Sequence, residues 1–151
     1  QPVDDAPDAL TIEAKAIKLL ANREHSRHEL ASKLRDRFDD SDLIDAVLDD
    51  LEQRQLLSDE RFAEMYVDLR VRKGYGPLRI RAELEERGIA AGLIESGLER
   101  AAADWSQLLL DAARQKFGSR SPGDSREQQK QARFLQYRGF PESLIRRYLW
   151  D

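Results

Sequence analysis

The chain has 151 residues, of which 36% are charged and 40% apolar, and its formal net charge is −4. This composition is typical of a folded, charge-rich helical protein and not of a disordered chain, and no apolar run is long enough to cross a bilayer. The absence of cysteine excludes a disulfide scaffold and thiolate chemistry. With no secretory signal in the sequence, we expect a cytoplasmic protein that does not contact a membrane.

The first helical pattern follows a segment that is rich in proline and aspartate. This segment, residues 1–10, predicts a flexible N-terminal tail, and Thr11 is the expected cap of the helix that follows it. The sequence from Ser26 to Glu29 matches a capping box, in which each of the two side chains binds the other residue's backbone N–H, and it predicts the start of a second helix. A third helix is expected to start at Ser41.

The next pattern is built around a tight glycine turn. Ser58 is the predicted N-cap of a helix. The run Gly74-Tyr75-Gly76 ends that helix, because glycine adopts backbone angles that a Cβ would prevent. Pro77 suits the first position of the following helix, where no N–H is needed, and Gly88 is expected to end it.

Basic side chains gather around this turn. Between Leu69 and Ala82 there are five of them and no acidic residue: Arg70, Arg72, Lys73, Arg79 and Arg81. Such a cluster around a rigid turn predicts a local positive field and a contact surface that includes Tyr75. The alternative is that each arginine is an ordinary solvated surface charge.

A third pattern begins at Asp104, and the three patterns are copies of one unit. Residues 118–124 are expected to be a loop, and Ser125 is predicted to open a capping box before the next helix. Apolar positions recur at offsets of 50 and 51 residues, and the pair Arg87-Gly88 recurs as Arg138-Gly139. The first unit departs from this plan, because Phe38 stands where the other two have glycine.

The sequence therefore predicts an all-α protein with nine helices, arranged as an elongated, curved array of three tandem three-helix repeats. The predicted boundaries are residues 11–57, 58–103 and 104–151. Residues 1–57, 58–103 and 104–151 carry net charges of −6, −1 and +3, so the two ends of the chain are expected to present different faces to partners.

The sequence lacks the usual motifs of catalysis. It has no phosphate-binding P-loop, and Gly74-Tyr75-Gly76 lacks the third glycine of a dinucleotide fingerprint. The two histidines, His25 and His28, are expected on the surface and make a weak metal site without cysteine or a converging carboxylate. Adjacent carboxylates on a helix point in different directions and do not form an acid–base pair. We expect a non-enzymatic protein without a cofactor or metal.

Three blocks of the sequence resemble the RecX family of bacterial regulators. They are the run from Leu56 to Ile89 with its G-Y-G-P-x-R-I-R core, the stretch from Arg23 to Leu34, and the segment from Asp104 to Phe140 with its R-F-L-Q-Y-R-G-F run. The resemblance covers about Ile12 to Trp150. It implies tandem three-helix repeats and a partner, the filament that the RecA recombinase forms on DNA. It also implies inhibition of the ATPase, strand-exchange and co-protease activities of RecA, and so a role in recombinational repair and the SOS response.

Two hypotheses for function follow. The first is a monomeric regulator of RecA, with a contact patch formed by the basic cluster, Tyr75 and three basic residues of the third unit, Lys130, Arg133 and Arg138. The second is a direct DNA-binding protein, because compact three-helix units also serve as helix-turn-helix domains. The basic third unit, which also carries Arg146 and Arg147, motivates the second hypothesis.

Overall fold

The computed structural model describes residues 8–101 and 104–151. Within these ranges the chain forms nine helices and no strand. The helices are α1 (Ala9–Asn22), α2 (Arg27–Arg37), α3 (Ser41–Gln53), α4 (Asp59–Arg72), α5 (Pro77–Glu86), α6 (Ala91–Arg100), α7 (Trp105–Phe117), α8 (Ser125–Arg138) and α9 (Glu142–Leu149).

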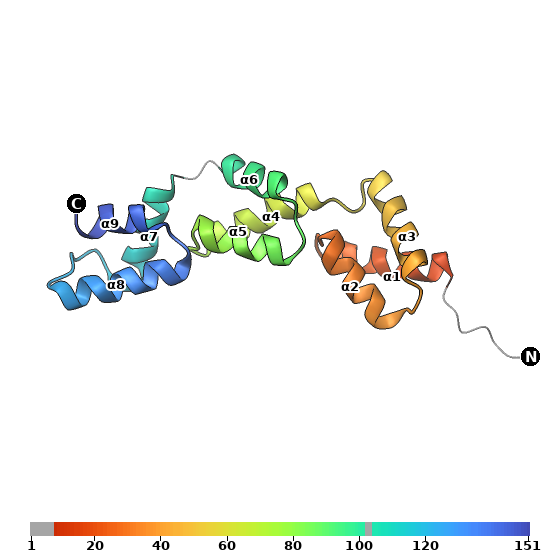
Figure 1. Ribbon diagram of the computed structural model, residues 1–151, viewed down its shortest axis with the longest axis horizontal. Coiled ribbons are helices and arrows are strands. Elements are labelled where there is room, and N and C mark those ends of the chain that lie inside the picture. Colours follow the sequence, from red (N-terminus) through yellow and green to blue (C-terminus); the bar gives the residue numbers. More distant parts are fainter. Residues whose placement is uncertain (1–7, 102–103) are drawn as a thin grey trace, which may run out of the picture.

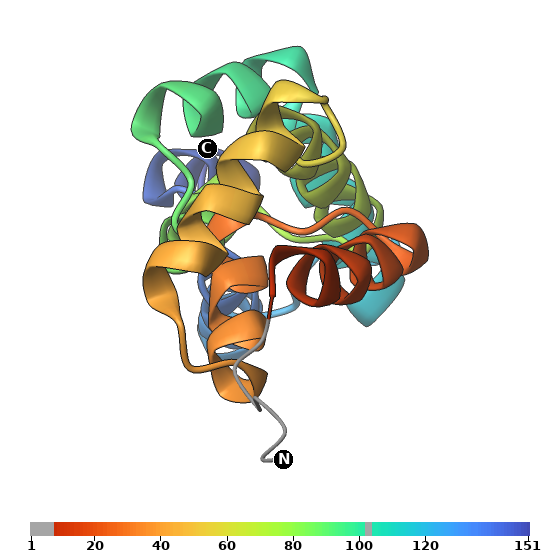
Figure 2. The ribbon, with the colours of Figure 1, turned by 90° about the vertical axis from the view of Figure 1, so that its right-hand side faces the viewer.

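The helices are grouped in threes, and the three groups lie in a row. Figure 1 shows α1–α3, α4–α6 and α7–α9 following one another along the long axis of the molecule. Figure 2 looks along this axis, with the first unit in front of the other two. Every pair of helices with extensive contacts lies within one unit. The predicted all-α array of three tandem three-helix repeats is confirmed, whereas the predicted unit boundaries stay a prediction.

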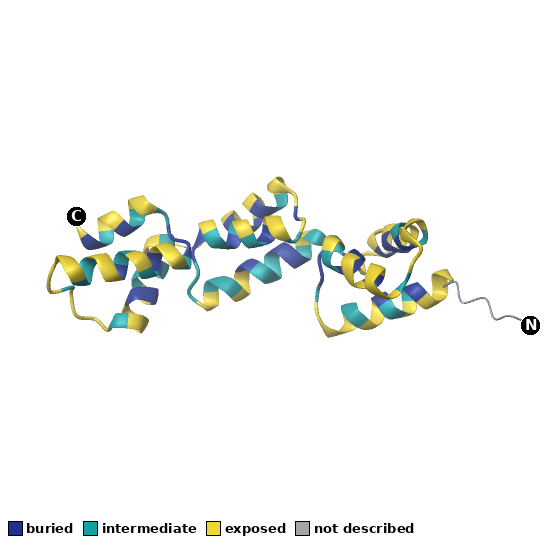
Figure 3. Cartoon of the chain, turned by 60° about the horizontal axis from the view of Figure 1, so that its bottom comes forward, coloured by how far each residue is buried: buried dark blue, intermediate teal, exposed yellow. Residues whose placement is uncertain are grey.

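Each unit has a small apolar core of its own. The three cores are centred on Leu34 in the first unit, Leu84 in the second and Leu135 in the third, and all three side chains are fully buried. Trp105 at the start of α7 packs against both the second and the third core. Figure 3 shows that buried residues line the inner faces of the helices within each unit, while the outer faces are exposed. Such small cores favour stacking of units.

The helix starts agree with the sequence in part. The capping box of Ser26 and Glu29 is present, and Ser58 caps α4. The cap of α1 is Asp8 and not Thr11, so the helix already begins at Ala9, inside the expected tail; residues 1–7 of that tail lie outside the described residues. Asp124 caps α8 in place of Ser125. In both corrected cases an aspartate one to three residues earlier offers a carboxylate, which is an equally good cap.

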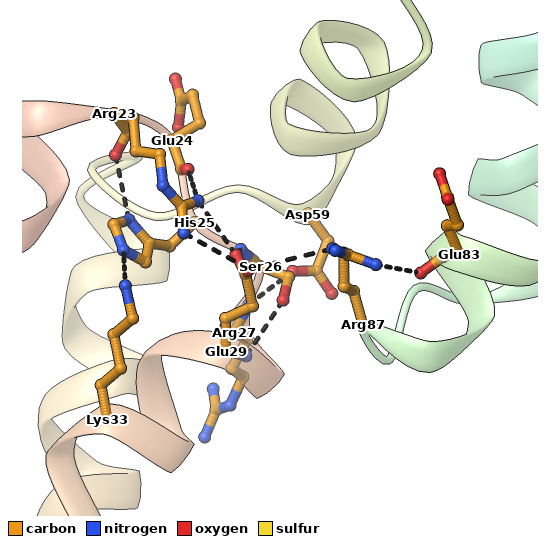
Figure 4. A network of polar contacts seen from close by, with 10 residues as sticks. All are labelled: Arg23, Glu24, His25, Ser26, Arg27, Glu29, Lys33, Asp59, Glu83 and Arg87. Carbon is orange, nitrogen blue, oxygen red and sulfur yellow. Dashed lines mark hydrogen bonds and ion pairs between the residues drawn. The ribbon is translucent and has the colours of Figure 1, made fainter. Parts of the chain in front are cut away.

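The first and second units meet where α2 begins. The backbone N–H of Arg27 donates to Asp59 Oδ1 at 2.8 Å, and Arg61 Nε donates to Glu24 Oε2 at 2.8 Å. Gly88, in the turn before α6, has a positive φ of 77°, and a Cβ there would lie 2.6 Å from the Cβ of His28. Figure 4 shows the polar part of this first joint.

The second and third units meet in an equivalent way. The N-terminus of α5 lies against the turn before α9, and two hydrogen bonds join the main chains: Gly76 N to Arg138 O at 2.7 Å and Leu78 N to Gly139 O at 3.0 Å. Gly139, like Gly88, has a positive φ. Each joint therefore packs the start of one unit's second helix against the glycine turn of the following unit. In the first unit, Phe38 takes the place of this glycine, with an extended φ of −124°.

The prediction that both histidines lie on the surface is wrong for His25. Its side chain is buried in the turn between α1 and α2, with Nδ1 3.0 Å from the carbonyl oxygen of Arg23 and Nε2 2.9 Å from Lys33 Nζ. An ammonium group only donates, so Nε2 accepts and the proton lies on Nδ1. Burial lowers the pKa of His25, and the nearby charges of Arg23 and Lys33 act in the same direction. His28 is exposed, as predicted.

This geometry predicts that acid weakens the fold through His25. The unfolded chain binds a proton at this side chain as the pH falls below about 6.5, whereas the folded chain resists protonation to a lower pH. The free energy of unfolding should therefore be greatest above about pH 6.5 and decrease as the pH falls from there through the lowered pKa of the folded state. Urea unfolding followed by circular dichroism from about pH 7.5 to about pH 5 measures it.

The matched variants are His25→Phe and His28→Phe. The first should abolish the decrease in the free energy of unfolding over this pH range, whatever its effect on stability at neutral pH. The second replaces an exposed imidazole and should keep the decrease. An unchanged pH dependence in His25→Phe would contradict the buried, neutral state of this histidine.

Candidate partner-binding surface

The ring of Tyr75 is the centre of the basic cluster at the second joint. Three guanidinium groups lie over it, with Cζ-to-centroid distances of 3.8 Å for Arg70, 4.5 Å for Arg79 and 4.8 Å for Arg138. They come from α4, α5 and the end of α8, so helices from two units converge on one side chain. The negative face of an aromatic ring attracts cations, with a gain of about 0.5–2 kcal/mol per pair.

The carboxylate of Glu83 accepts hydrogen bonds from two of these cations. Glu83 accepts from Arg70 Nε and Nη2, both at 2.8 Å, from Arg79 Nε at 3.1 Å and from the hydroxyl of Tyr66 at 2.8 Å. Partial burial acts to raise the pKa of Glu83, but these hydrogen bonds outweigh it and hold the pKa below its usual value. Burial and the bond to Glu83 raise the pKa of Tyr66 to about 12. The carboxylate is thus ionised and offsets one of the three positive charges around Tyr75.

The third cation of the cluster, Arg138, forms a hydrogen bond between the second and third units. Arg138 Nη1 donates to the carbonyl oxygen of Lys73 at 2.8 Å, and Arg79 Nη1 donates to the carbonyl oxygen of Tyr137 at 3.2 Å. These reciprocal bonds lie beside the main-chain hydrogen bonds of Gly76 and Leu78. A Cβ on Gly76 would lie 2.6 Å from both the carbonyl carbon and the oxygen of Gly139. Only glycine permits this approach.

The structure divides the predicted contact residues into two groups. Four of them form ion pairs within the second unit: Arg70 and Arg79 with Glu83, Arg72 with Asp68 at 2.7 Å, and Arg81 with Glu95 at 2.8 Å. Lys73, Lys130, Arg133 and Arg138 form no ion pair with any residue in 8–101 or 104–151. Of this second group, Lys73, Lys130 and Arg133 are exposed and Arg138 is half-buried.

The free cations are concentrated on α8. Lys130 and Arg133 are three residues apart on this helix, which places them on the same side of it, and Arg126 lies one turn before Lys130. Two carboxylates of the third unit are occupied as helix caps, Asp104 at α7 and Asp124 at α8. The positive charge of the unit is therefore left available to carboxylates or phosphates of a partner.

The chemistry of the side chains at the second joint suits recognition of a partner. The reactive-looking side chains at the joint are arginines and a tyrosine of raised pKa, which bind anions or aromatic rings but do not transfer protons near neutral pH. No group of three or more histidine, cysteine or acidic residues in the described parts of the chain could hold a metal ion. None of the described helices is both long and apolar enough to span a membrane.

Sequence reasoning missed the structural role of Glu83 and the involvement of Arg138 in the joint. The spacing of Arg79 and Glu83, four residues apart on a helix, is a readable ion-pair signal, as is that of Asp68 and Arg72. The repeat also indicates that Gly139 corresponds to Gly88. The contact between Arg138 and Tyr75 could not be predicted in this way, because it joins residues that are far apart in the sequence. The side chain of Tyr137 is 71% exposed, and Tyr75 is half-buried.

Comparison with family models matches all three units. The models described as the first, second and third three-helix domains of RecX match residues 14–51, 58–98 and 104–149. Together they cover most of the chain.

Curated relatives and solved structures agree. The protein named "Regulatory protein RecX" in Pseudomonas fluorescens strain Pf-5 is 44% identical over 140 residues, which are 93% of this chain and 90% of the relative. Its namesake in Pseudomonas savastanoi pv. phaseolicola is 46% identical over 145 residues, or 96% and 92% of the two chains. The crystal structure of RecX from Lactobacillus salivarius superimposes with a TM-score of 0.77 over 91% of this chain and 92% of that chain; at 24% identity, this likeness shows the fold.

The close approach at the second joint predicts that Gly76→Ala is destabilising. The φ of Gly76 is −93°, which alanine adopts without strain, so the cost comes only from the clash with Gly139. Overpacking of this kind costs about 1–3 kcal/mol. We expect a lower free energy of unfolding in urea, together with a larger radius of gyration in X-ray scattering as the two units separate.

Gly92→Ala is the control, because a Cβ at this helical position meets nothing within 4 Å. It should be neutral or slightly stabilising, since alanine favours a helix over glycine by up to about 1 kcal/mol. Equal effects of the two substitutions would show that the joint is not held by this backbone contact.

Proposed function

The chain belongs to the RecX family of regulatory proteins, and from this premise we propose that it binds the nucleoprotein filament of RecA and inhibits its ATPase, strand-exchange and co-protease activities. The observation that carries the proposal is the match of all three units to this family, with relatives 44–46% identical over nearly the whole chain. The protein acts in the cytoplasm as a monomer, without catalysis of its own, and modulates recombinational repair and the SOS response.

The elongated row of units supports this proposal physically. A filament repeats the same surface along its axis, and a protein that is itself a row of similar units can contact several protomers at once. Each contact can be weak, because linked contacts add avidity without any new interface. The second joint keeps two of the units in a fixed relation through main-chain hydrogen bonds, which avoids part of the ordering cost on binding.

The predicted contact residues have two different roles, which depend on whether each side chain is exposed or takes part in the second joint. We assign Lys73, Lys130 and Arg133 to the direct contact, because they are exposed and form no ion pair within the described residues. Arg72 and Arg81 join them, since exposed ion pairs are weak and exchange readily for a partner's carboxylate. Arg70, Tyr75, Arg79 and Arg138 support the surface by holding the second joint.

The proposal predicts how charge reversal on α8 affects RecA. ATP hydrolysis by RecA on single-stranded DNA should decrease when this protein is added at sub-stoichiometric amounts. The double variant Lys130→Glu with Arg133→Glu should require a roughly tenfold higher concentration for half-inhibition, equivalent to about 1.4 kcal/mol of binding free energy. Its circular dichroism spectrum should be unchanged, because both side chains are exposed.

The matched control is Lys18→Glu with Arg37→Glu. It changes the net charge by the same amount at exposed positions of the first unit and should inhibit like the original protein. Failure of the original protein to inhibit RecA would overturn the proposed function. Equal inhibition by both double variants would remove only the α8 surface from it.

Direct DNA binding is the second candidate function, and the free cations of α8 favour it. If these residues contact phosphates, binding to naked DNA should weaken steeply between about 50 and about 200 mM salt. The double variant Lys130→Glu with Arg133→Glu should then reduce the slope of log affinity against log salt by about 2. Fluorescence anisotropy with labelled single- and double-stranded oligonucleotides measures both. No binding at low salt would dismiss this candidate.

A further inference from the structure

A groove runs along the second joint, beside the cations of α8. It has a volume of about 910 Å³ and is formed by the start of α5, one face of α8, and α9 with the residue after it. Figure 1 shows these helices meeting where the second and third units touch. The residues that matter most in its lining are Leu78, Tyr137, Phe140, Ile145, Arg146 and Trp150.

Several large apolar side chains line the groove. Phe140 and Ile145 are buried and form the floor, while Leu78, Tyr137 and Trp150 are 48%, 71% and 46% exposed. These three are among only seven large apolar side chains that are exposed on the described part of the chain, so their convergence on one groove is notable. Exposed apolar side chains that gather in a groove mark an interaction site.

The walls of the groove are held in place without a ligand. The indole N–H of Trp150 donates to Gln128 Oε1 at 3.1 Å, and Gln128 Nε2 donates to the carbonyl oxygen of Leu149 at 3.2 Å. The guanidinium of Arg79 lies over the ring of Tyr137 at 4.8 Å. A partner therefore meets a preformed surface and pays little conformational entropy to order it.

The charges around the groove are predominantly positive. Arg146 on its wall is exposed and only loosely paired with Glu142, at 3.5 Å. Lys130 and Arg133 lie on the same helix as the lining residues Gln129, Ala132 and Gln136, and Arg133 lies one residue after Ala132 and three before Gln136. Neither cation has an ion-pair partner among the described residues. An occupant with carboxylates beside an apolar side chain would complement both the floor and the rim.

We propose that this groove binds an acidic segment of a partner protein, which inserts an aliphatic or aromatic side chain onto Phe140 and Ile145 and places carboxylates against Arg146 and Arg133. This proposal rests on the proposed function in one respect, namely that the partner is taken to be the protein component of a filament. A nucleic acid fits less well, because the floor of the groove is apolar and accommodates a side chain better than a phosphate.

The test uses the full chain and defined peptides. The probe is a fluorescein-labelled peptide of about twelve residues, enough for three helical turns, with glutamate at most positions and one leucine and one phenylalanine as anchors. Anisotropy should report saturable binding that weakens with salt. A peptide with the same anchors and lysine in place of glutamate should bind at least tenfold more weakly, and so should one with the anchors replaced by serine.

Two pairs of variants locate the site. Leu78→Glu places a like charge in the groove, and its control Leu69→Glu alters a leucine of similar exposure, 44%, on α4 away from the groove. Arg146→Ala removes a groove cation, and its control Arg147→Ala removes an exposed neighbour on α9 that does not line the groove. Leu78→Glu and Arg146→Ala should weaken peptide binding at least tenfold, and the two controls should leave it unchanged.

Three outcomes would overturn the proposal. The first is that the acidic peptide does not bind. The second is that each variant and its control change peptide binding equally. The third is that Leu78→Glu loses oligonucleotide binding or self-association and still binds the peptide. The RecA ATPase assay distinguishes failure of the groove proposal from failure of the proposed function. If the original protein and Leu78→Glu inhibit RecA equally, RecA does not use the groove, although the peptide can still bind there. If neither inhibits, the proposed function fails by itself.

Discussion

The structure depends on one recurring contact, in which the start of a unit's second helix lies against the glycine turn of the next unit. At the second joint this brings main chain onto main chain, with Gly76 and Gly139 in direct contact and two hydrogen bonds across the boundary. Neither position tolerates a Cβ there, so two glycines far apart in the sequence are required by the same contact. The first unit has Phe38 at the corresponding place, with an extended φ of −124°. This unit therefore lacks the glycine turn of positive φ that Gly88 and Gly139 provide at the two joints.

The two joints use the same geometry but different forces. The first relies on side-chain ion pairs and one side-chain-to-backbone bond, through Glu24, Arg61 and Asp59, and exposed ion pairs are weak and screened by salt. The second adds main-chain hydrogen bonds and the convergence of three guanidinium groups on Tyr75. The second and third units are thus joined more firmly than the first and second. The surface that we assign to partner binding, including the groove, spans this firmer joint.

The fold could be predicted from the sequence because its signals are local. Apolar spacing, the capping box at Ser26 and the turn at Gly74–Gly76 each lie within one helix or turn, and the apolar spacing recurs in all three units. The role of each arginine could not be predicted in the same way. Arg70 and Glu83 are 13 residues apart and Arg138 is 65 residues from Lys73, so only the packing of helices shows that these cations are occupied. His25 misled for the same reason, since a polar residue in a turn is usually exposed, and its burial depends on acceptor and donor groups that the fold supplies.

The division of the cations also bears on how the molecule would lie on a filament. The sequence suggested that the positive surface surrounds the glycine turn, but there four of the arginines pair with Glu83, Asp68 and Glu95. The uncompensated positive charge is on the third unit, which carries nine basic and six acidic residues, while the first unit, with its preceding segment, carries eight and fourteen. An elongated molecule with oppositely charged ends is oriented by the field of a polyanion before it makes contact. On a nucleoprotein filament, the third unit and the groove beside it would therefore approach first, and the acidic first unit would be held away from the phosphates.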